Sequence, residues 1–539
     1  MGLGPAFINV LDDDPTQASE DPIVFRTAST LGARLRTLIE GLPRTRRWTL
    51  YLSRSGVIDR DVEVPSNFVL TCAPRVVLFL IRGVTLTIRG PVELGRERRF
   101  SLAETSRVML LGTLDAILPV WWRVGPGDDD APAIEAAVET VLRRADERLP
   151  QAPIVLDRPY WLRRPVQIAW EGQAAGVDDL REIIFSGRHP LGASDGPASL
   201  NGSGTSSLLS VRGHVRLVMV AVGLSATEVP TVEPPTPESL IDMAGEFDGS
   251  SFERCTFCGL RQSFIRLRRL PRSRIADLTT IADRLDGRQS GDDADLEQLA
   301  TEVDAPEAGI VRITSCAMRR TARFVAEDGI AVLRGARVLL SITSSSFRSN
   351  AGSVVAVSIG HLTIEDCRFD LDLSSDHYLD QENQLKKSPV RGEGVFISRL
   401  WSAIVAGEVV RRELLGARRL SPPPVPLGGV SVVATHLRVR GLAALAGAPI
   451  SQAGTEMQLT LNNVLQEGTP LAEFSVDLQG APVDGALVLH GCVFAGDVLA
   501  FEANHGSFQV IDVGTRLPPR ARILTSNVVR RLPRTAVQP

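Results

Sequence analysis

The sequence predicts an all-β fold of the β-solenoid type, with capping helices near the N-terminus and two partly helical insertions between coils of stacked strands. Three observations support this fold class. A short phrase recurs about every 20–30 residues. Two amphipathic helical stripes precede runs of strand-forming residues, and two charged or proline-rich segments interrupt the recurring phrase.

The recurring phrase has an apolar residue three positions before a central slot. The slots are Cys255, Cys316, Ser345, Cys367, His436, Val464 and Cys492, and the apolar residues before them are Phe252, Ile313, Ile342, Ile364, Val433, Leu461 and Leu489. Slots 316–345, 345–367, 436–464 and 464–492 are 29, 22, 28 and 28 residues apart. This period is typical of stacked strand repeats, in which equivalent side chains lie above one another at about 4.8 Å.

A free cysteine in such a slot behaves as a small hydrophobe, so we interpret the slot as an inward-facing position in the middle of a strand. The competing interpretation is a metal or redox site, because Cys255 and Cys258 form a C-x-x-C pair. A zinc site needs further ligands at suitable spacing, and none follows. In a strand the two thiols would also point to opposite faces. The sequence therefore predicts neither a metal nor a cofactor.

Composition limits the classes of partner. The chain has 59 Lys and Arg against 63 Asp and Glu, a net charge of −4, so it lacks the basic excess typical of nucleic-acid-binding proteins. The most apolar run, 76–88, contains Arg82 and is too short to span a bilayer. The first residues do not form a secretory signal. We therefore expect no nucleic acid, no membrane span, and a location in the cytoplasm or in a phage-like or injection-type particle.

Two helical stripes lie in the N-terminal part. In the first, Leu31, Leu35, Leu38, Ile39 and Leu42 form a helical stripe, and Ser29 or Thr30 is the expected N-cap. The second follows the acidic cap residues 128–130, and its apolar face consists of Ile134, Ala137, Val138, Val141 and Leu142. A Leu-Pro pair and a strand follow each stripe. A solenoid needs such caps, because an exposed terminal coil offers unpaired backbone groups to other chains.

These elements predict a linear organisation of eight segments. They are a polar lead-in (1–27), a helix-plus-strand module (28–120), the start of the coils with a capping helix (121–260), a charged insertion (261–308), coils (309–370), an insertion with a helix and a proline-rich stop (371–428), further coils (429–515) and a C-terminal tail (516–539).

One stretch resembles pectate-lyase-superfamily and phage tailspike-like proteins. The resemblance is carried by Gly90-Pro91-Val92-Glu93, Trp121-Trp122, Gly127-Asp128-Asp129-Asp130, and Ala133-Ile134 with Ala136-Ala137. The segment 123–126 departs from the start of the family's turn. The resemblance implies a right-handed parallel β-helix with an N-terminal capping helix, and relatives that bind or cleave polysaccharides along a groove. Tailspike-like proteins tend to be homotrimers, so it also implies a homo-oligomer.

The best acidic constellation follows the slot residue Cys367. Asp366, Asp370 and Asp372 are the candidate catalytic residues, and Arg368, His377 and Arg391 are the candidate substrate-binding residues. Glycoside hydrolysis needs two carboxyl groups on neighbouring coils, roughly 5–9.5 Å apart. Strand alternation places Asp366, Arg368 and Asp370 in one outward row. The alternative interpretation is a solvated face that keeps the strands from aggregating.

Two functions remain open at this stage. The first is a non-catalytic structural or adhesive protein of the tailspike type, which binds a glycan or a protein assembly partner through side loops. The second is a polysaccharide-degrading enzyme, a hydrolase or a lyase, with an acidic groove site. Aromatic residues that could stack on sugars are sparse. Trp161, Trp170 and Trp401 are candidates, and for most of them we expect a role in the core.

Overall fold

The structure is a computed structural model, and it is mostly strands in parallel sheets with few helices among the residues that it describes. The predicted all-β class is thereby confirmed. The chain divides into two compact units: unit 1 is Met1–Ile168 with Ile183–Leu200, and unit 2 is Ala169–Glu182 with Asn201–Pro539. The described residues are 6–9, 30–123, 125, 128–170, 180–187, 198–203, 207–227, 239–258, 264–268, 309–319, 333–335, 338–349, 355–357, 360–371, 377–379, 385–387, 430–435, 438–440, 443–447, 455–462, 465–467, 473–478, 483–493, 498–503, 508–516, 522–525 and 529–531.

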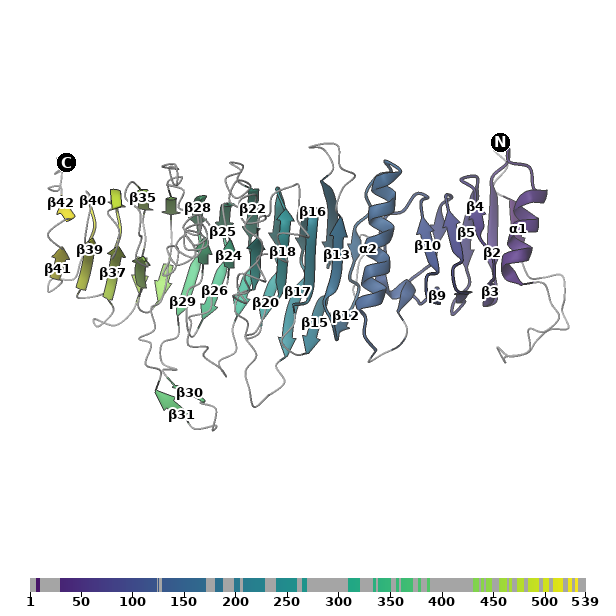
Figure 1. Cartoon of the computed structure of the whole chain (residues 1–539), viewed down its shortest axis with the longest axis horizontal. Coiled ribbons are helices and arrows are strands. Elements are labelled where there is room, and N and C mark those ends of the chain that lie inside the picture. Colours follow the sequence, from purple (N-terminus) through teal and green to yellow (C-terminus); the bar gives the residue numbers. More distant parts are fainter. Residues whose placement is uncertain are drawn as a thin grey trace, which may run out of the picture. The chain divides into compact units, whose positions relative to one another are not determined.

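Unit 1 contains three parallel sheets, and each successive stretch of chain between residues 48 and 110 adds one strand to every sheet (Figure 1). The first sheet is β1 (Ala6–Asn9), β2 (Trp48–Leu52), β5 (Phe68–Cys72) and β8 (Val92–Glu93). The second is β3 (Gly56–Ile58), β6 (Leu78–Leu80) and β9 (Phe100–Leu102), and the third is β4 (Val62–Val64), β7 (Thr85–Ile88) and β10 (Arg107–Leu110). β1 falls within the range predicted as a polar lead-in.

Alternation of side chains builds the interior of these sheets. In β5, for example, Phe68, Leu70 and Cys72 are buried while the residues between them are half-buried. This repeat does not contain the small slot residue that marks the later coils. Its inward positions are mostly large apolar side chains such as Phe68 and Leu70, so the recurring phrase did not reveal it in the sequence.

Two glycines in unit 1 allow backbones to approach closely. A Cβ at Gly90 would lie 1.7 Å from the carbonyl oxygen of Phe68, and a Cβ at Gly112 would lie 1.7 Å from the carbonyl oxygen of Gly90. Only glycine fits at such positions. Gly90, which opens the Gly-Pro phrase of the family resemblance, is therefore required by the packing of the backbone.

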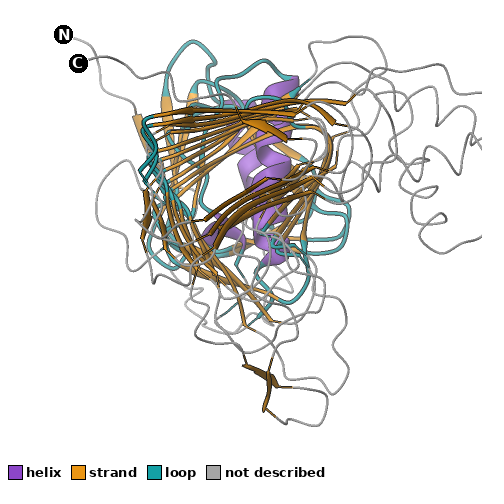
Figure 2. Cartoon of the chain, turned by 90° about the vertical axis from the view of Figure 1, so that its left-hand side faces the viewer, coloured by secondary structure: helices purple, strands orange, loops and turns teal. Residues whose placement is uncertain are grey.

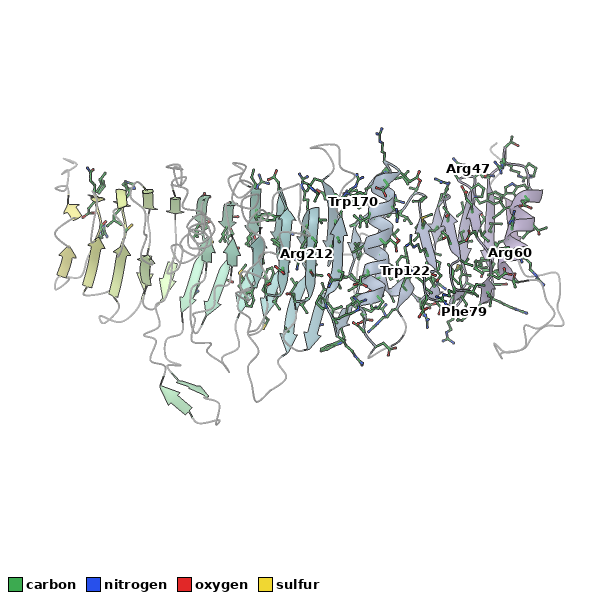
Figure 3. The ribbon with its side chains drawn as sticks, in the orientation of Figure 1. Arg47, Arg60, Phe79, Trp122, Trp170 and Arg212 are labelled. Carbon is green, nitrogen blue, oxygen red and sulfur yellow. The ribbon has the colours of Figure 1, made fainter. Side chains whose placement is uncertain are left out.

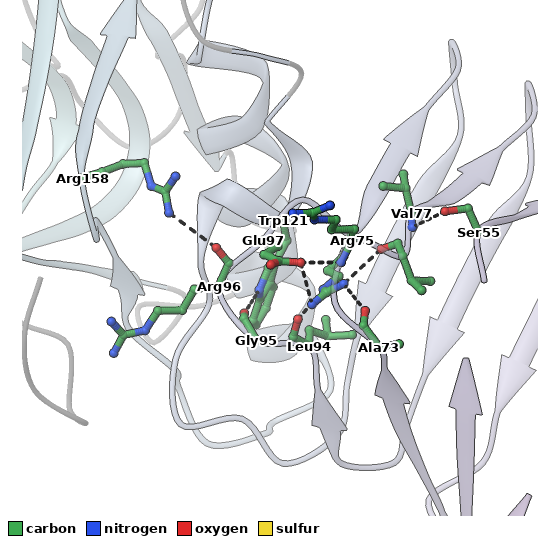
Figure 4. Close-up of polar contacts among 12 residues, drawn as sticks. Ser55, Ala73, Arg75, Val77, Leu94, Gly95, Arg96, Glu97, Trp121 and Arg158 are labelled. Carbon is green, nitrogen blue, oxygen red and sulfur yellow. Dashed lines mark hydrogen bonds and ion pairs between the residues drawn. The ribbon is translucent and has the colours of Figure 1, made fainter. Parts of the chain in front are cut away.

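Polar contacts tie the loops of unit 1 together (Figure 4). Trp121 Nε1 donates to the carbonyl of Gly95 at 2.7 Å. The guanidinium of Arg99 is only 3% exposed and donates to the backbone carbonyls of Ala73, Val76 and Leu94. Buried carbonyls that no strand partner reaches are thus satisfied by a side chain.

Helix α1 (Leu31–Gly41) confirms the first helical prediction. The Thr30 side chain accepts a hydrogen bond from Ala33 N at 3.3 Å, and Leu31, Leu35 and Ile39 are buried. Leu38 and the C-cap residue Leu42 of the predicted stripe are only half-buried. The helix contacts β3 and β4 (Figure 1). It therefore covers apolar side chains at the start of the strand repeat, as expected for a cap.

Helix α2 (Ala131–Asp146) confirms the second prediction, with Ile134, Ala137, Val138 and Val141 buried. A short 3-10 helix, η1 (Pro119–Trp122), precedes it. Leu142 is only half-buried, whereas Arg144 is buried. The expected cap is also modified: Asp129 Oδ1 accepts from Ala131 N at 3.1 Å, while the N-cap residue Asp130 makes no side-chain cap bond.

The next strands are β11 (Ile154–Val155), β12 (Pro159–Leu162), β13 (Val166–Trp170), β14 (Arg181–Ser186) and β15 (Ser199–Ser203). In unit 2, a sheet that we call sheet I pairs β16 (Leu209–Val220), β19 (Ser250–Glu253), β22 (Gly309–Thr314), β25 (Val338–Thr343), β28 (Gly360–Glu365), β32 (Val430–Thr435), β35 (Thr455–Asn462), β38 (Val483–His490), β40 (Phe508–Val513) and β42 (Val529–Arg531), all parallel.

Three further parallel sheets complete unit 2. Sheet II pairs β17 (Gly223–Thr227), β20 (Thr256–Cys258), β23 (Ala317–Arg319), β26 (Ser346–Ser349), β29 (Arg368–Leu371), β33 (Arg438–Arg440) and β36 (Leu465–Glu467). Sheet III pairs β16, β18 (Ile241–Glu246), β21 (Ile265–Arg268), β24 (Leu333–Gly335) and β27 (Val355–Val357). Sheet IV pairs β34 (Ala443–Gly447), β37 (Glu473–Leu478), β39 (Val498–Ala503) and β41 (Arg522–Thr525). Viewed end on, the strands overlay one another in separate layers (Figure 2).

The register of sheet I aligns the recurring phrase. Phe252 pairs with Ile313, Ile313 with Ile342, and Ile342 with Ile364. All four side chains are buried. The apolar position of the phrase is therefore an inward column in these four coils, as the sequence predicts. The alignment is wrong for the phrase with slot His436, because Ile364 pairs with Ala434 and not with Val433, so this phrase was placed one residue too early.

The slot itself lies in a bend and not in the middle of a strand, which corrects our expectation. Sheet I strands end two residues before the slot, and sheet II strands begin one residue after it. The residue in front of the slot has a positive φ at Arg254, Ser315, Ser344, Asp366 and Gly491, with values between 49° and 60°. This left-handed residue turns the chain from sheet I into sheet II.

The slot side chains are nevertheless buried. Cys255, Cys316, Ser345, Cys367 and Cys492 are at most 2% exposed. The backbone continues the ladder through the bend, since Ala317 N donates to Cys255 O and Arg368 N donates to Ser345 O, both at 2.9 Å. Slots 436 and 464 lie outside the described residues.

Several predicted segments fall largely outside the described residues. β21 lies in the range 261–308, and the antiparallel pair β30 (His377–Leu379) and β31 (Leu385–Lys387) lies in the range 371–428. The rest of both ranges is outside the description. Strands β41 and β42 lie within the range predicted as a C-terminal tail.

Candidate functional site

The predicted acidic row begins at the bend between β28 and β29. Asp366 has a φ of 55° and is exposed, and Arg368, at the start of β29, is also exposed. We expected Asp366 to continue the alternation of a single strand with Arg368 and Asp370. That expectation is wrong for Asp366, because β28 ends at Glu365 and the left-handed residue turns the chain there.

Asp370 lies in the interior of sheet II, between two arginine positions. Its Cα is in register with that of Arg348 in β26 on one side and that of Arg440 in β33 on the other. Directly opposed positions of neighbouring strands are the nearest neighbours across a sheet. The register therefore places basic residues, and not a second carboxylate, on both strands next to Asp370.

Of the other predicted site residues, His377 begins β30, which pairs with β31. Asp372 and Arg391 lie outside the described residues. The register gives Asp370 no carboxylate at the directly opposed position of either neighbouring strand.

The C-x-x-C pair divides as predicted. Cys255 is 1% exposed, whereas Cys258 is half-buried on β20. Within the described ranges no group of three or more His, Cys, Asp or Glu side chains could hold a metal ion. Burial raises the pKa of the Cys367 thiol to about 11, and contact with the Cys316 thiol together with burial raises the pKa of Cys255. These neutral thiols are poor nucleophiles and poor metal ligands.

The most connected polar cluster of unit 1 lies at the start of α2 and was not found from the sequence. Asp130 is 1% exposed, and its Oδ1 accepts from Arg123 Nε at 2.7 Å. The Arg123 guanidinium lies 5.8 Å from the ring centre of Tyr160, whose hydroxyl donates to Asp157 Oδ1 at 2.8 Å. Arg158 completes the chain of contacts with an ion pair of 2.9 Å to Asp157.

This cluster is built for rigidity rather than for reaction. Asp157 is 2% exposed and Tyr160 is fully buried, so neither reaches a substrate. Burial, followed by the charge of Asp157, raises the pKa of Tyr160 well above its usual value. Both carboxylates are paired with arginine, as buried charges require. The Gly-Asp-Asp-Asp phrase of the family resemblance signals the turn here but not this network.

Exposed side chains complete the description of both units. Phe79 on β6 is 41% exposed, and Arg212 on β16 pairs with Asp242 at 3.0 Å (Figure 3). Trp161, next to the buried cluster, is 45% exposed. Trp170 lies beneath the guanidinium of Arg181 at 4.7 Å and is half-buried. Of the three tryptophans considered for sugar stacking, Trp161 is therefore the accessible one, and Trp401 lies outside the described residues.

Comparison with protein-family models, with curated proteins and with solved structures finds no match for this chain. Among the described residues, no helix is long and apolar enough to cross a membrane.

Proposed function

We propose that the chain is a right-handed parallel β-helix that acts as a non-catalytic structural or adhesive protein of the tailspike type, binding a glycan or a protein assembly partner through side loops. The fold part of this proposal is supported by the repeated order of strands. From β18 to β29, each coil passes through sheet III, sheet I and sheet II in turn, and each strand pairs in parallel with its equivalent in the next coil. Connections between parallel strands of the same sheet are almost always right-handed, which supports a right-handed helix of coils.

The observation that carries the functional part is the register around Asp370. A hydrolase of the polysaccharide type needs two carboxylates at short range. Here the positions next to Asp370 on both neighbouring strands are arginines, Arg348 and Arg440. Alternating charge along a column stabilises a long sheet and keeps its surface soluble.

The loops between the coils are the natural contact elements. In stacked-repeat proteins, insertions project from one face, which is often the binding face. The ranges 261–308 and 371–428 interrupt the coils at such positions. The family resemblance adds the expectation of a homo-oligomer, and we propose a homotrimer as its form.

A panel of neutral and anionic polysaccharides tests the function. The purified chain is assayed for binding and, in parallel, for new reducing ends and unsaturated products, with Asp366→Asn and Asp370→Asn as matched variants. We expect binding without cleavage, unchanged in the variants. Cleavage that both variants abolish would overturn the proposal in favour of an acidic groove enzyme. Light scattering coupled to size-exclusion chromatography measures the oligomer.

A further inference from the structure

Trp161 is the most exposed large hydrophobic side chain among the described residues, at 45%. It lies on β12 between Tyr160 and Leu162, which are both buried. Strand alternation therefore directs its indole ring outward. Nearly half of the surface of this residue is thus left to solvent, where the flat indole ring is available to a ligand.

The backbone of Trp161 is held rigidly. Trp161 N donates to Asp130 Oδ2 at 2.8 Å, and Asp130 N donates to Trp161 O at 2.8 Å. Asp130 is itself fixed by Arg123 through its other oxygen. Two residues further on, Arg163 N donates to Asp129 Oδ1 at 3.0 Å. The strand backbone that carries the exposed ring is thus tied to Asp129 and Asp130, the two residues before helix α2, which reduces the ordering cost of binding.

The surroundings of the ring are polar. Arg163 and Arg164 follow it in the chain and are exposed. Arg164 is oriented by Glu135, with a contact of 2.5 Å, and lies 3.7 Å from Asp129. One flat apolar face bordered by charged hydrogen-bonding groups suits a ligand that has an apolar face and a polar rim.

A pyranose ring has that character, because its C–H groups form an apolar face and its hydroxyls lie around the edge. An apolar protein surface would need a contiguous apolar patch instead. Such a patch is present elsewhere in unit 1, where Phe79, Ile81 and Leu102 are each at least 37% exposed on or beside β6 and β9.

We propose that Trp161 is a stacking platform for a pyranose ring of a polysaccharide, with Arg163 at its polar rim. The platform rests on the proposed function, since it identifies where that glycan contact is made. It lies on the rigid strand β12 and not on an insertion. A neutral and a uronic-acid polysaccharide distinguish whether the stacked ring or the arginine rim dominates recognition.

The test measures the affinity of the full chain for both immobilised polysaccharides, in the native form and as Trp161→Ala, Trp161→Phe and Phe79→Ala. We expect Trp161→Ala to weaken binding about 10-fold or more, since a stacked aromatic is a typical binding hot spot. Trp161→Phe should retain part of the affinity, and Phe79→Ala should bind like the native chain. Unchanged thermal melting of Trp161→Ala verifies that the fold is intact.

Several results would overturn the platform. Native-like affinity of Trp161→Ala rejects the platform while glycan binding, and with it the proposed function, stands. Absence of binding by the native chain to either polysaccharide rejects the platform and leaves the proposed function only its protein-partner form. A change in oligomeric mass of Trp161→Ala, with sugar affinity unchanged, assigns the ring to a subunit interface.

Discussion

Replacing Arg144 with methionine should destabilise unit 1 locally by about 3 kcal/mol. The Arg144 side chain is 2% exposed, and it donates to the carbonyls of Leu110, Gly112 and Pro150 at 2.9, 2.6 and 2.9 Å. Methionine keeps the apolar stem but leaves the buried carbonyls of Leu110 and Gly112, and the partly buried carbonyl of Pro150, without that donor. At about 1–3 kcal/mol per unsatisfied group the loss is several kcal/mol, and the lower end applies because removing the buried charge relieves its desolvation.

Burial lowers the pKa of Arg144 from its usual value, because desolvation disfavours the charged guanidinium. Arg143 provides the matched control on the same helix. It pairs with Asp146 at 3.7 Å, and its side chain is 45% exposed. An exposed pair of this kind contributes about 0–1 kcal/mol, so Arg143→Met should be nearly neutral.

Hydrogen exchange followed by mass spectrometry gives the local readout on the full chain. In peptides covering 107–112 and 147–155, Arg144→Met should raise exchange rates roughly 100-fold, since about 1.4 kcal/mol corresponds to a factor of ten. Arg144→Lys, which keeps a charge but loses the planar fork, should fall between the two. Exchange in Arg144→Met as slow as in Arg143→Met would refute the reasoning, because it would mean that the three carbonyls do not depend on the guanidinium.

Two further predictions concern the bends and the thiols. At the left-handed positions φ is 60° at Gly491 and 54° at Arg254. Gly491→Val should therefore destabilise the chain by about 1–2 kcal/mol, and Arg254→Gly should stabilise it by about 1 kcal/mol. Urea unfolding measures both free energies, and changes of the same sign would contradict the assignment of these positions to the bends. Burial raises the pKa of Cys72 and of Cys367 to about 11 from 9.0. The unfolded chain then loses these protons first as pH rises from 9 to 11, so stability should fall in that window, by on the order of 1–3 kcal/mol per thiol. Replacing both by valine should flatten the pH dependence of melting between pH 9 and 11, and an equally steep fall in that variant would exclude the thiols as its cause.

The sequence determined the class of fold and the positions that face inward. Local patterns suffice for this, because an apolar stripe such as Leu31, Leu35 and Ile39 or a column such as Phe252, Ile313 and Ile342 depends only on spacing along the chain. Both sets are buried in the structure. The two helices and the strand repeat of unit 2 therefore followed from periodicity, whereas the strand repeat of unit 1, which lacks the recurring phrase, did not.

Tertiary structure decided the bends, the strand partners and the polar cluster. The chain turns before each slot through a left-handed residue, and at Arg254 and Ser315 the residue type does not predict that conformation. That Asp370 lies between Arg348 and Arg440 depends on which strands become neighbours. The spacing in the chain, 22 residues from Arg348 to Asp370 and 70 from Asp370 to Arg440, hides that register.

The buried cluster illustrates the same division most clearly. Asp130, Arg123 and Trp161 are separated by up to 38 residues, and no local pattern links them. They meet because helix α2 packs beside strand β12, where Asp130 and Trp161 exchange hydrogen bonds of 2.8 Å. The sequence predicts Asp130 as a helix cap. In the structure this buried carboxylate instead anchors the backbone of the exposed Trp161, because its hydrogen-bond partners are the groups that folding brings within reach.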